Sequence, residues 1–350
     1  MTVFISLVTY HSEADIESCL AALQQQEPTM QIKLALLDNA SGDGTVARVR
    51  EALGLDHNRA QNGNLDVELM QLHVNLGFSG GHNLNAAAFL ESSYEYFLVL
   101  NPDVELAPNA LAQFVAASKR YQDRCIITPK LFRKTHEASL QHDASLLDAA
   151  GMELTDDLRH FDRGSNEVDR FFQEEAVFGG TGACLFFPKA VVQQLLLRGS
   201  ERDKDILQLF PQLAFRYEER APLFDEGFFA YREDADLCWR AGHLGVRTIF
   251  APQVCGTHVR KVLPTNRREL SPVLNGLSVR NRFLLQYNNY FLETMTVSNV
   301  LRGLIARNLL VFAGVCLKEV ASLPYLLDLL KLIPRARERR RILQLRKRKT

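Results

Sequence analysis

Four short apolar runs, each ended abruptly by polar residues, constrain the fold of this chain more than any other feature. The runs are Val3–Val8, Ile32–Leu37, Val67–Leu72 and Tyr96–Leu100. Nearly continuous apolar runs of this length are typical of strands buried on both faces. Helical spacing appears between the first two runs, where Ile16 is followed by Cys19, Leu20 and Leu23. This alternation predicts an α/β fold with a mainly parallel sheet.

The segments that follow the four runs are rich in Asn, Asp, Gly and Thr. They are Thr9-Tyr10-His11, Asp38–Thr45, Asn75–Asn83 and Asn101-Pro102-Asp103. Each segment alone is typical of an ordinary turn, because these residue types dominate turns. Ligands of parallel sheets bind at the carboxyl ends of the strands. Four such segments in series therefore predict one shared nucleotide site.

The second half of the chain is less regular. Phe178–Phe187 contains three glycines and predicts a turn that enters a buried strand. A helix is expected from Pro108 and another from near Glu233, and Val246–Phe250 predicts a strand that ends before Pro252. The 350 residues are enough for one large domain or two modest ones.

Several functional classes lose support at this stage. The loop Gly77-x-x-Gly80-Gly81 is not a dinucleotide fingerprint, and the chain has no P-loop motif. The six cysteines include no C-x-x-C pair, which fits a reducing cytosol better than a disulfide scaffold. The first residues lack the basic start of a signal peptide, so we expect a protein that is not exported.

Carboxylates at predicted strand and helix ends indicate the chemistry. Asp103 is placed to hold a hard cation that bridges a diphosphate. Asp38 is placed to accept a hydrogen bond from a base or a ribose. Glu233 and Asp234 open a predicted helix, where acidic residues also complement the helix dipole, so structural and chemical roles both remain open for this pair.

Together these segments resemble family-two glycosyltransferases, and among them the bacterial rhamnosyltransferases of cell-surface polysaccharide assembly. The resemblance rests on Val8–Ser12, Leu37–Ser41, Asn75–Asn83, Leu100–Asp103 and Phe228–Arg240, and it covers about residues 3–290. It implies a GT-A fold in residues 1–290, with a nucleotide-sugar half (1–128) and an acceptor half (129–290). Residues 291–350 would form a basic amphipathic helical extension.

The resemblance also implies roles for individual residues. The positions that match the donor-nucleotide site are Thr9, Tyr10, Asp38, Asn39, Asn75, Gly77, Asn83, Asn101 and Asp103. Asn101 replaces the first acidic residue of the D-x-D motif, so Asp103 would carry most of the binding of Mg²⁺ or Mn²⁺, with His258 completing the metal site. Asp234 matches the general base, with Glu233 as its neighbour. Gly180, Gly182 and Arg280 match positions near the donor and acceptor pocket.

The implied reaction is inverting transfer of a sugar from a nucleotide-diphosphate donor to a saccharide acceptor. L-Rhamnose from dTDP-rhamnose is the expected donor, and the acceptor is expected to be linked to polyprenyl diphosphate. There are three alternatives. The protein could transfer another hexose from a UDP-sugar, it could be a nucleotidyltransferase, or it could be a non-catalytic sugar-binding relative. If no metal is used, Arg280 or Arg282 would neutralise the leaving group instead.

The charge of the chain is strongly divided. Residues 1–259 hold 22 Lys and Arg against 36 Asp and Glu, whereas residues 260–350 hold 19 against 5. Such a basic segment suggests contact with an anionic surface. The longest uncharged run of the tail, residues 308–317, is about half of what spans a bilayer.

We therefore expect an interfacial helix and a basic cluster on the inner leaflet of the cell membrane. This places the protein in the cytoplasm as a peripheral membrane protein. Packing of the tail on the body or in a homodimer is the alternative. No aromatic residues interleave with the basic run, so nucleic-acid binding is not expected.

Overall fold

A computed structural model describes residues 1–134, 146–197, 209–216, 222–260, 271–291 and 296–347. The strands are β1 (Thr2–Thr9), β2 (Gln31–Asp38), β3 (Arg59–Asn62), β4 (Leu65–Gln71), β5 (Tyr96–Leu100), β6 (Val104–Leu106), β7 (Cys125–Arg133), β8 (Leu147–Ala149), β9 (Met152–Leu154), β10 (His160–Asp162), β11 (Glu175–Val177), β12 (Cys184–Pro188) and β13 (Arg247–His258).

The helices lie mostly between these strands in the sequence. They are α1 (Ile16–Gln24), α2 (Thr45–Leu53), α3 (Gly77–Glu91), α4 (Ala110–Arg120), α5 (Lys189–Leu195), η2 (Pro211–Arg216), α6 (Glu233–His243), α7 (Pro272–Asn289), η5 (Asn299–Arg307), α8 (Asn308–Lys318), η6 (Val320–Ser322) and α9 (Leu323–Lys347).

One central sheet joins both halves of the chain. Its order is β11-β13-β7-β12-β5-β1-β2-β4-β3, with β6 added beside β13 and β8 beside β7. The strands β5, β1, β2 and β4 are parallel, as the sequence predicts. The expected boundary between the two halves, residue 128, falls inside β7, so the same sheet continues across it.

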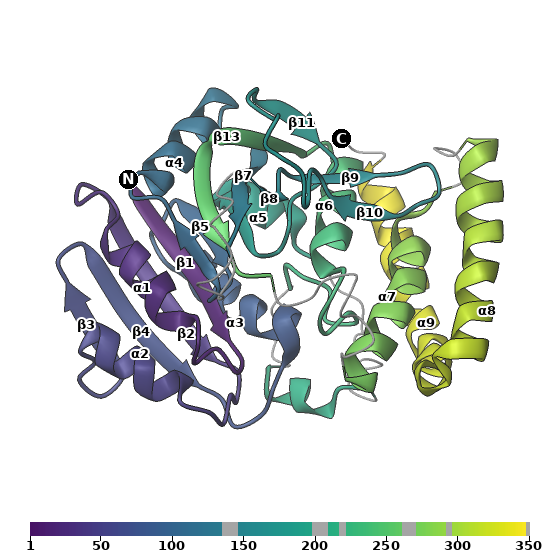
Figure 1. Ribbon diagram of the computed structural model, residues 1–350, viewed down its shortest axis with the longest axis horizontal. Coiled ribbons are helices and arrows are strands. Elements are labelled where there is room, and N and C mark those ends of the chain that lie inside the picture. Colours follow the sequence, from purple (N-terminus) through teal and green to yellow (C-terminus); the bar gives the residue numbers. More distant parts are fainter. Residues whose placement is uncertain (135–145, 198–208, 217–221, 261–270, 292–295, 348–350) are drawn as a thin grey trace.

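Helices cover both faces of this sheet (Figure 1). Successive side chains of a strand point to opposite faces, and β5 shows this clearly. Leu98 packs with α1, α2 and α4 in one core cluster, whereas its neighbours Phe97 and Val99 pack with α3, α5 and α6 in the other. The continuous apolar runs are thus explained by a sheet that is buried on both sides.

One predicted strand end is wrong. The sequence led us to expect a strand that stops before Pro252, but β13 continues to His258. Its pairing with β7 shifts register between Ala251 and Cys255. A bulge of this kind tolerates proline, because the residue there is outside the hydrogen-bond ladder. The continuation matters, since it brings His258 to the edge of the sheet where the polar segments lie.

The basic tail is also placed differently from the expectation. Arg335 and Arg339 of α9 form ion pairs with Asp225, which is completely buried, and Arg339 also pairs with Asp236. Further along α9, Arg346 donates to the Leu196 carbonyl at 2.9 Å. These arginines therefore hold α9 on the acidic body, and they do not form the exposed basic cluster that the sequence suggested.

We predict that Arg335→Ala lowers the free energy of unfolding by about 3 kcal/mol, because it removes one partner of a buried carboxylate. Chemical denaturation followed by circular dichroism measures this change. Arg337→Ala is the matched control, since Arg337 is exposed on the same helix, and it should change stability by less than about 0.5 kcal/mol. Equal stability of both variants would contradict the docking of α9 through Asp225.

Candidate functional site

Strand register brings the polar segments to one edge of the sheet. Thr9 pairs in register with Asp38 between β1 and β2, while Leu100 lies between Leu7 on one side and Cys184 on the other. Asn101 then donates its backbone N–H to the Ala183 carbonyl at 2.9 Å. The ends of β1, β2 and β5 therefore lie beside the glycine turn that precedes β12.

At the ends of β1 and β2, the residues predicted to bind the donor nucleotide mostly form hydrogen bonds with one another or with neighbouring loops. Asp38 is buried and accepts hydrogen bonds from Thr9 Oγ1 at 3.0 Å and from Ser41 Oγ at 2.5 Å. Asn39 is buried and joins Leu76 N–H to the Gly77 carbonyl. Tyr10 is half exposed, with its ring against His11. Tyr10 is thus the member of this group that presents a ring to solvent.

The loop before α3 approaches another loop very closely. Gly77 has φ +72°, and a Cβ at this position would lie 2.4 Å from the Phe229 carbonyl oxygen. Asn75 accepts the Gly77 N–H at 2.7 Å. A residue with a side chain would be strained here both by its backbone angle and by this contact. Asn75 and Gly77 therefore set the path of the loop beside Phe229.

Asn83 lies inside the protein, where its amide fixes the segment before α6. Its Oδ1 accepts the N–H groups of Leu223 and Phe224, and its Nδ2 donates to Glu226 Oε1 at 2.9 Å. The side chain is almost completely buried. Asn83 thus holds the chain that leads to the acidic pair. Its buried side chain is not placed to contact a nucleotide directly in this structure.

The two residues predicted to bind a metal meet where β13 ends. His258 pairs with Val104 across β13 and β6, and its Nε2 lies 3.3 Å from Oδ1 of Asp103. On the other side of the ring, Nδ1 lies 2.7 Å from Oδ2 of the buried Asp148. Burial by itself lowers the pKa of His258, but the two carboxylates outweigh it and raise the pKa to about 9.

This arrangement fits a divalent cation. Oδ1 of Asp103 is buried, and its neighbour His258 Nε2, 3.3 Å away, is not in hydrogen-bond alignment with it. A carboxylate on the far nitrogen of a histidine is the usual support of a metal-bound imidazole. The described residues contain no cluster of three or more His, Cys, Asp or Glu suited to a metal. Asp103 and His258 would supply only two ligands. Cations that also bind substrate phosphates are commonly held by so few protein groups.

The acidic pair opens α6 on the opposite side of the glycine turn. Oδ2 of Asp234, which is half-buried, accepts the Gly182 N–H at 2.8 Å, while Glu233 is buried. Burial raises the pKa of both carboxyls, and the charge of Asp234 adds to the rise at Glu233. A carboxylate with a raised pKa is a better proton acceptor near neutral pH. Gly180, in the same turn as Gly182, packs tightly against Thr128 of β7.

Arg280, which was predicted to lie near the donor and acceptor pocket, is bonded to the loop before α6. Its guanidinium is almost completely buried and donates to the Gly227 and Phe228 carbonyls, at 2.6 and 3.2 Å. Burial lowers its pKa to about 10. Arg280 therefore shapes the loop before the acidic pair. His82 of α3 is also buried, and its Nδ1 lies 2.7 Å from Ser6 Oγ.

The sequence reasoning missed three charged residues that link the two sides of the site. Arg260 binds Asp148 through Nε at 2.6 Å and Asp162 through Nη2 at 2.5 Å. The charge of Asp162 in turn contributes to the raised pKa of Asp234. One signal was present, because Asp148 interrupts the apolar stretch Leu146–Ala150 and an acidic residue there must be paired.

Comparison with known proteins agrees with this geometry. Residues 4–196, more than half of the chain, match the family described as glycosyl transferase family 2. The chain therefore belongs to glycosyl transferase family 2. It is 31% identical over 186 residues to rhamnosyltransferase WbbL of Escherichia coli (strain K12), a match that covers 51% of this chain and 60% of that protein.

Solved structures show the same fold. Residues 1–349 of TarS from S. aureus align with a TM-score of 0.51 and 16% identity, covering 100% of this chain and 88% of that one. GalNAc-T7 aligns with a TM-score of 0.56 and 12% identity, covering 82% of this chain and 47% of that one. The expected GT-A fold is thus confirmed.

We predict that Asn83→Ala lowers the free energy of unfolding by about 3 kcal/mol, because it leaves two buried N–H groups without an acceptor. Thermal or chemical unfolding measures the change. Asn75→Ala removes a single local hydrogen bond and should cost about 1 kcal/mol or less. If Asn83→Ala were as stable as the parent and only bound nucleotide more weakly, its assignment as a structural residue would be wrong.

Proposed function

We propose that this protein is an inverting, metal-dependent glycosyltransferase that moves a sugar from a nucleotide-diphosphate donor to a saccharide acceptor. One observation carries the proposal. The hydrogen bonds from Asn101 to Ala183 and from Gly182 to Asp234 join the metal-side loop to the acidic pair through two adjacent residues. Inverting transfer needs one protein group beside the leaving diphosphate and another beside the attacking hydroxyl, on opposite sides of the sugar. The glycine turn lies between Asp103 and Asp234, which are the groups we propose for these two roles.

These positions support the following reaction. Asp234 accepts the proton of the acceptor hydroxyl, whose oxygen forms a bond to the anomeric carbon as the bond from that carbon to the diphosphate oxygen breaks. The diphosphate leaves with the bonding electrons, and the configuration inverts. Asp103 and His258 would hold Mg²⁺ or Mn²⁺, which supplies positive charge against the leaving diphosphate. Asp148 holds the imidazole of His258 in place.

L-Rhamnose from dTDP-rhamnose is the donor we propose. It is supported by the similarity to a rhamnosyltransferase, although the chain spans about 60% of the length of that relative. Another hexose carried by UDP is the second candidate. It is favoured by two structures of similar fold, one of TarS in complex with UDP-GlcNAc and one of GalNAc-T7 with UDP, GalNAc and Mn²⁺.

We further propose that the acceptor saccharide is linked to polyprenyl diphosphate, and that the protein acts in the cytoplasm at the inner face of the membrane during cell-envelope polysaccharide synthesis. A carrier lipid keeps its saccharide at the membrane surface, so an enzyme located there meets its acceptor at high local concentration. Release of a free nucleoside diphosphate, and not of pyrophosphate, would separate this function from that of a nucleotidyltransferase.

Asp234→Asn should lower turnover by a factor of about 10² to 10⁴, the usual contribution of a general base. Donor affinity, measured by calorimetry, should stay within a few-fold of the parent, because Asp234 lies on the side of the acceptor. Asp56→Asn removes an exposed carboxylate and serves as the control with parental turnover. Transfer by Asp234→Asn at a near-normal rate would exclude Asp234 as the base.

Asp103→Ala should weaken binding of the nucleoside diphosphate by about tenfold or more when Mg²⁺ or Mn²⁺ is present, because one of two metal ligands is lost. In EDTA, the parent and the variant should bind the nucleotide equally. Calorimetric titration with and without EDTA makes both measurements. If affinity is the same in all four titrations, the mechanism is free of metal and the leaving group is neutralised by basic residues.

A further inference from the structure

The outer side of η5 and α8 is an apolar surface that the body of the protein does not cover. Its main members, which we call the α8 surface, are Leu301, Ile305, Leu309, Leu310, Phe312 and Leu317, each between 49% and 80% exposed. Of the described residues in η5 and α8, only Gly303 and Val315 are buried. So many exposed large apolar side chains on one element mark a binding surface.

This helix is longer than the sequence indicated. Residues 299–318 form one helix of 20 residues with a mean hydropathy of 1.8, which is long and apolar enough to cross a membrane by length and composition. Charge was the reason for expecting a shorter apolar element, since Arg302 and Arg307 interrupt the sequence. In the structure α8 stands at the edge of the molecule beside α7 and α9 (Figure 1).

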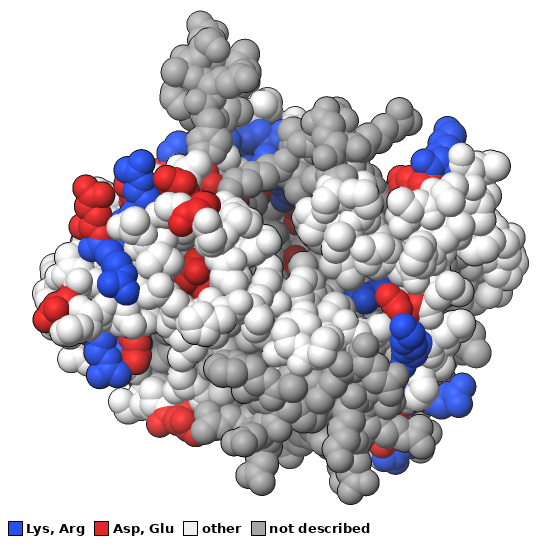
Figure 2. Space-filling model, turned by 90° about the horizontal axis from the view of Figure 1, so that it is seen from below, with Lys and Arg blue, Asp and Glu red and all other residues white. Residues whose placement is uncertain are grey.

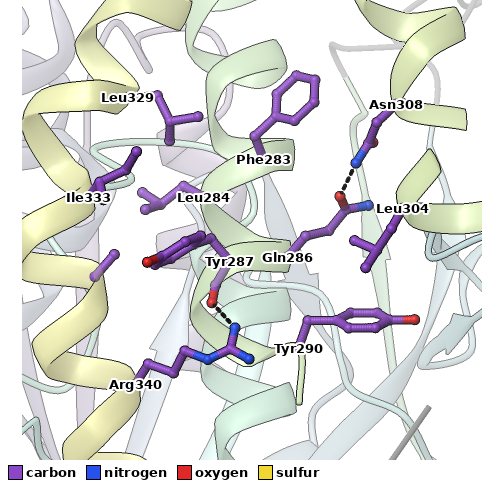
Figure 3. A pocket seen from close by; sticks show the side chains of 11 residues that line it. Phe283, Leu284, Gln286, Tyr287, Tyr290, Leu304, Asn308, Leu329, Ile333 and Arg340 are labelled. Carbon is purple, nitrogen blue, oxygen red and sulfur yellow. Dashed lines mark hydrogen bonds between the residues drawn. The ribbon is translucent and has the colours of Figure 1, made fainter. Parts of the chain in front are cut away.

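Polar groups help to attach this helix to the body, while most of its large apolar side chains are exposed. Asn308 donates from Nδ2 to Gln286 Oε1 at 2.7 Å (Figure 3). It also accepts from Arg282 Nε at 3.1 Å. Asn299 donates to the Asp156 carbonyl at 3.0 Å. A helix that packs on a protein in water has the opposite polarity. This inverted pattern is expected when hydrocarbon is the outer solvent.

The charges on the helix favour phospholipid over a second copy of the chain. Residues 299–318 contain three cations and no carboxylate, and the exposed Arg302 and Lys318 lie near its two ends. If the same helix of another copy packed against it, either direction would place cation near cation, which is unfavourable. Lipid phosphates can accept both cations at the margin while the leucines enter the acyl region.

The view in Figure 2 shows the same distribution. The end of the molecule where α8 lies is a broad uncoloured area, with charged side chains at its margin. Three arginines of α9 do not add to a basic cluster there, because Arg335, Arg339 and Arg346 bind groups of the body. Apolar contact, and not the basic tail, is therefore the main attraction that this end offers.

We propose that the α8 surface lies in the interfacial region of a phospholipid membrane, with the helix along the membrane plane. The helix would lie on the membrane and would not cross it. It lines one pocket together with α7, which is part of the body of the protein. This inference rests on the peripheral membrane location given under the proposed function. The α8 surface would provide that location, mainly through apolar contact with lipid.

Co-sedimentation of the full chain with phospholipid vesicles tests the proposal. We expect binding to neutral phosphatidylcholine vesicles that persists from about 0.1 M to 1 M salt, where screening removes charge attraction, and tighter binding to vesicles that contain phosphatidylglycerol. Leu310→Asp with Leu317→Asp should weaken binding to neutral vesicles by more than about tenfold. Both side chains are exposed, so the variant should unfold at the parental temperature.

Val168→Asp with Val273→Asp is the matched control, because it adds the same charge at two exposed apolar positions outside η5 and α8. It should bind vesicles like the parent. The proposal would be overturned if the Leu310/Leu317 variant bound vesicles as well as the parent does, or if salt abolished the binding. It would also be overturned if no form bound vesicles and the parent formed a dimer that this variant dissociates. Donor binding is measured without vesicles, so failure of the proposed activity is detected separately.

Discussion

The position of β5 between β1 and β12 is the constraint on which the rest of the site depends. Its parallel neighbour, β1, leads to segments predicted to bind the nucleotide, and its antiparallel neighbour, β12, begins at the glycine turn that holds Asp234. Because the three strands are paired by backbone hydrogen bonds and packed on both faces, their ends cannot move independently. Groups that come from residues 9, 103, 182 and 234 are thereby held at one edge of the sheet.

The sequence predicted the features that depend on local pattern. The strands near residues 3, 32, 67 and 96 form because continuous apolar runs are buried on both faces, and the acidic start of α6 lies within one residue of its expected place. Features that depend on partners distant in the chain were not predictable in this way. Nothing near Asp148 in the sequence indicates that its partners are His258 and Arg260.

The division of charge shows the same limit. A net negative body and a net positive tail suggested an external anionic surface, because the sequence does not say where each charge lies. In the structure, part of that attraction is internal, since buried Asp225 and Asp236 bind arginines of α9. The apolar residues of η5 and α8 are then left on the outside. The feature that the tail offers to a membrane is therefore its hydrocarbon surface, with a few cations at the margin.

A crystal structure of the protein with Mn²⁺ and a nucleoside diphosphate tests the central claim most directly. The account predicts an anomalous manganese peak in contact with the Asp103 carboxylate and His258 Nε2, with the diphosphate on the same ion and the Asp234 carboxylate facing the space beyond it. Manganese or nucleotide bound at another edge of the sheet, or a diphosphate that contacts neither Asp103 nor His258, would contradict it.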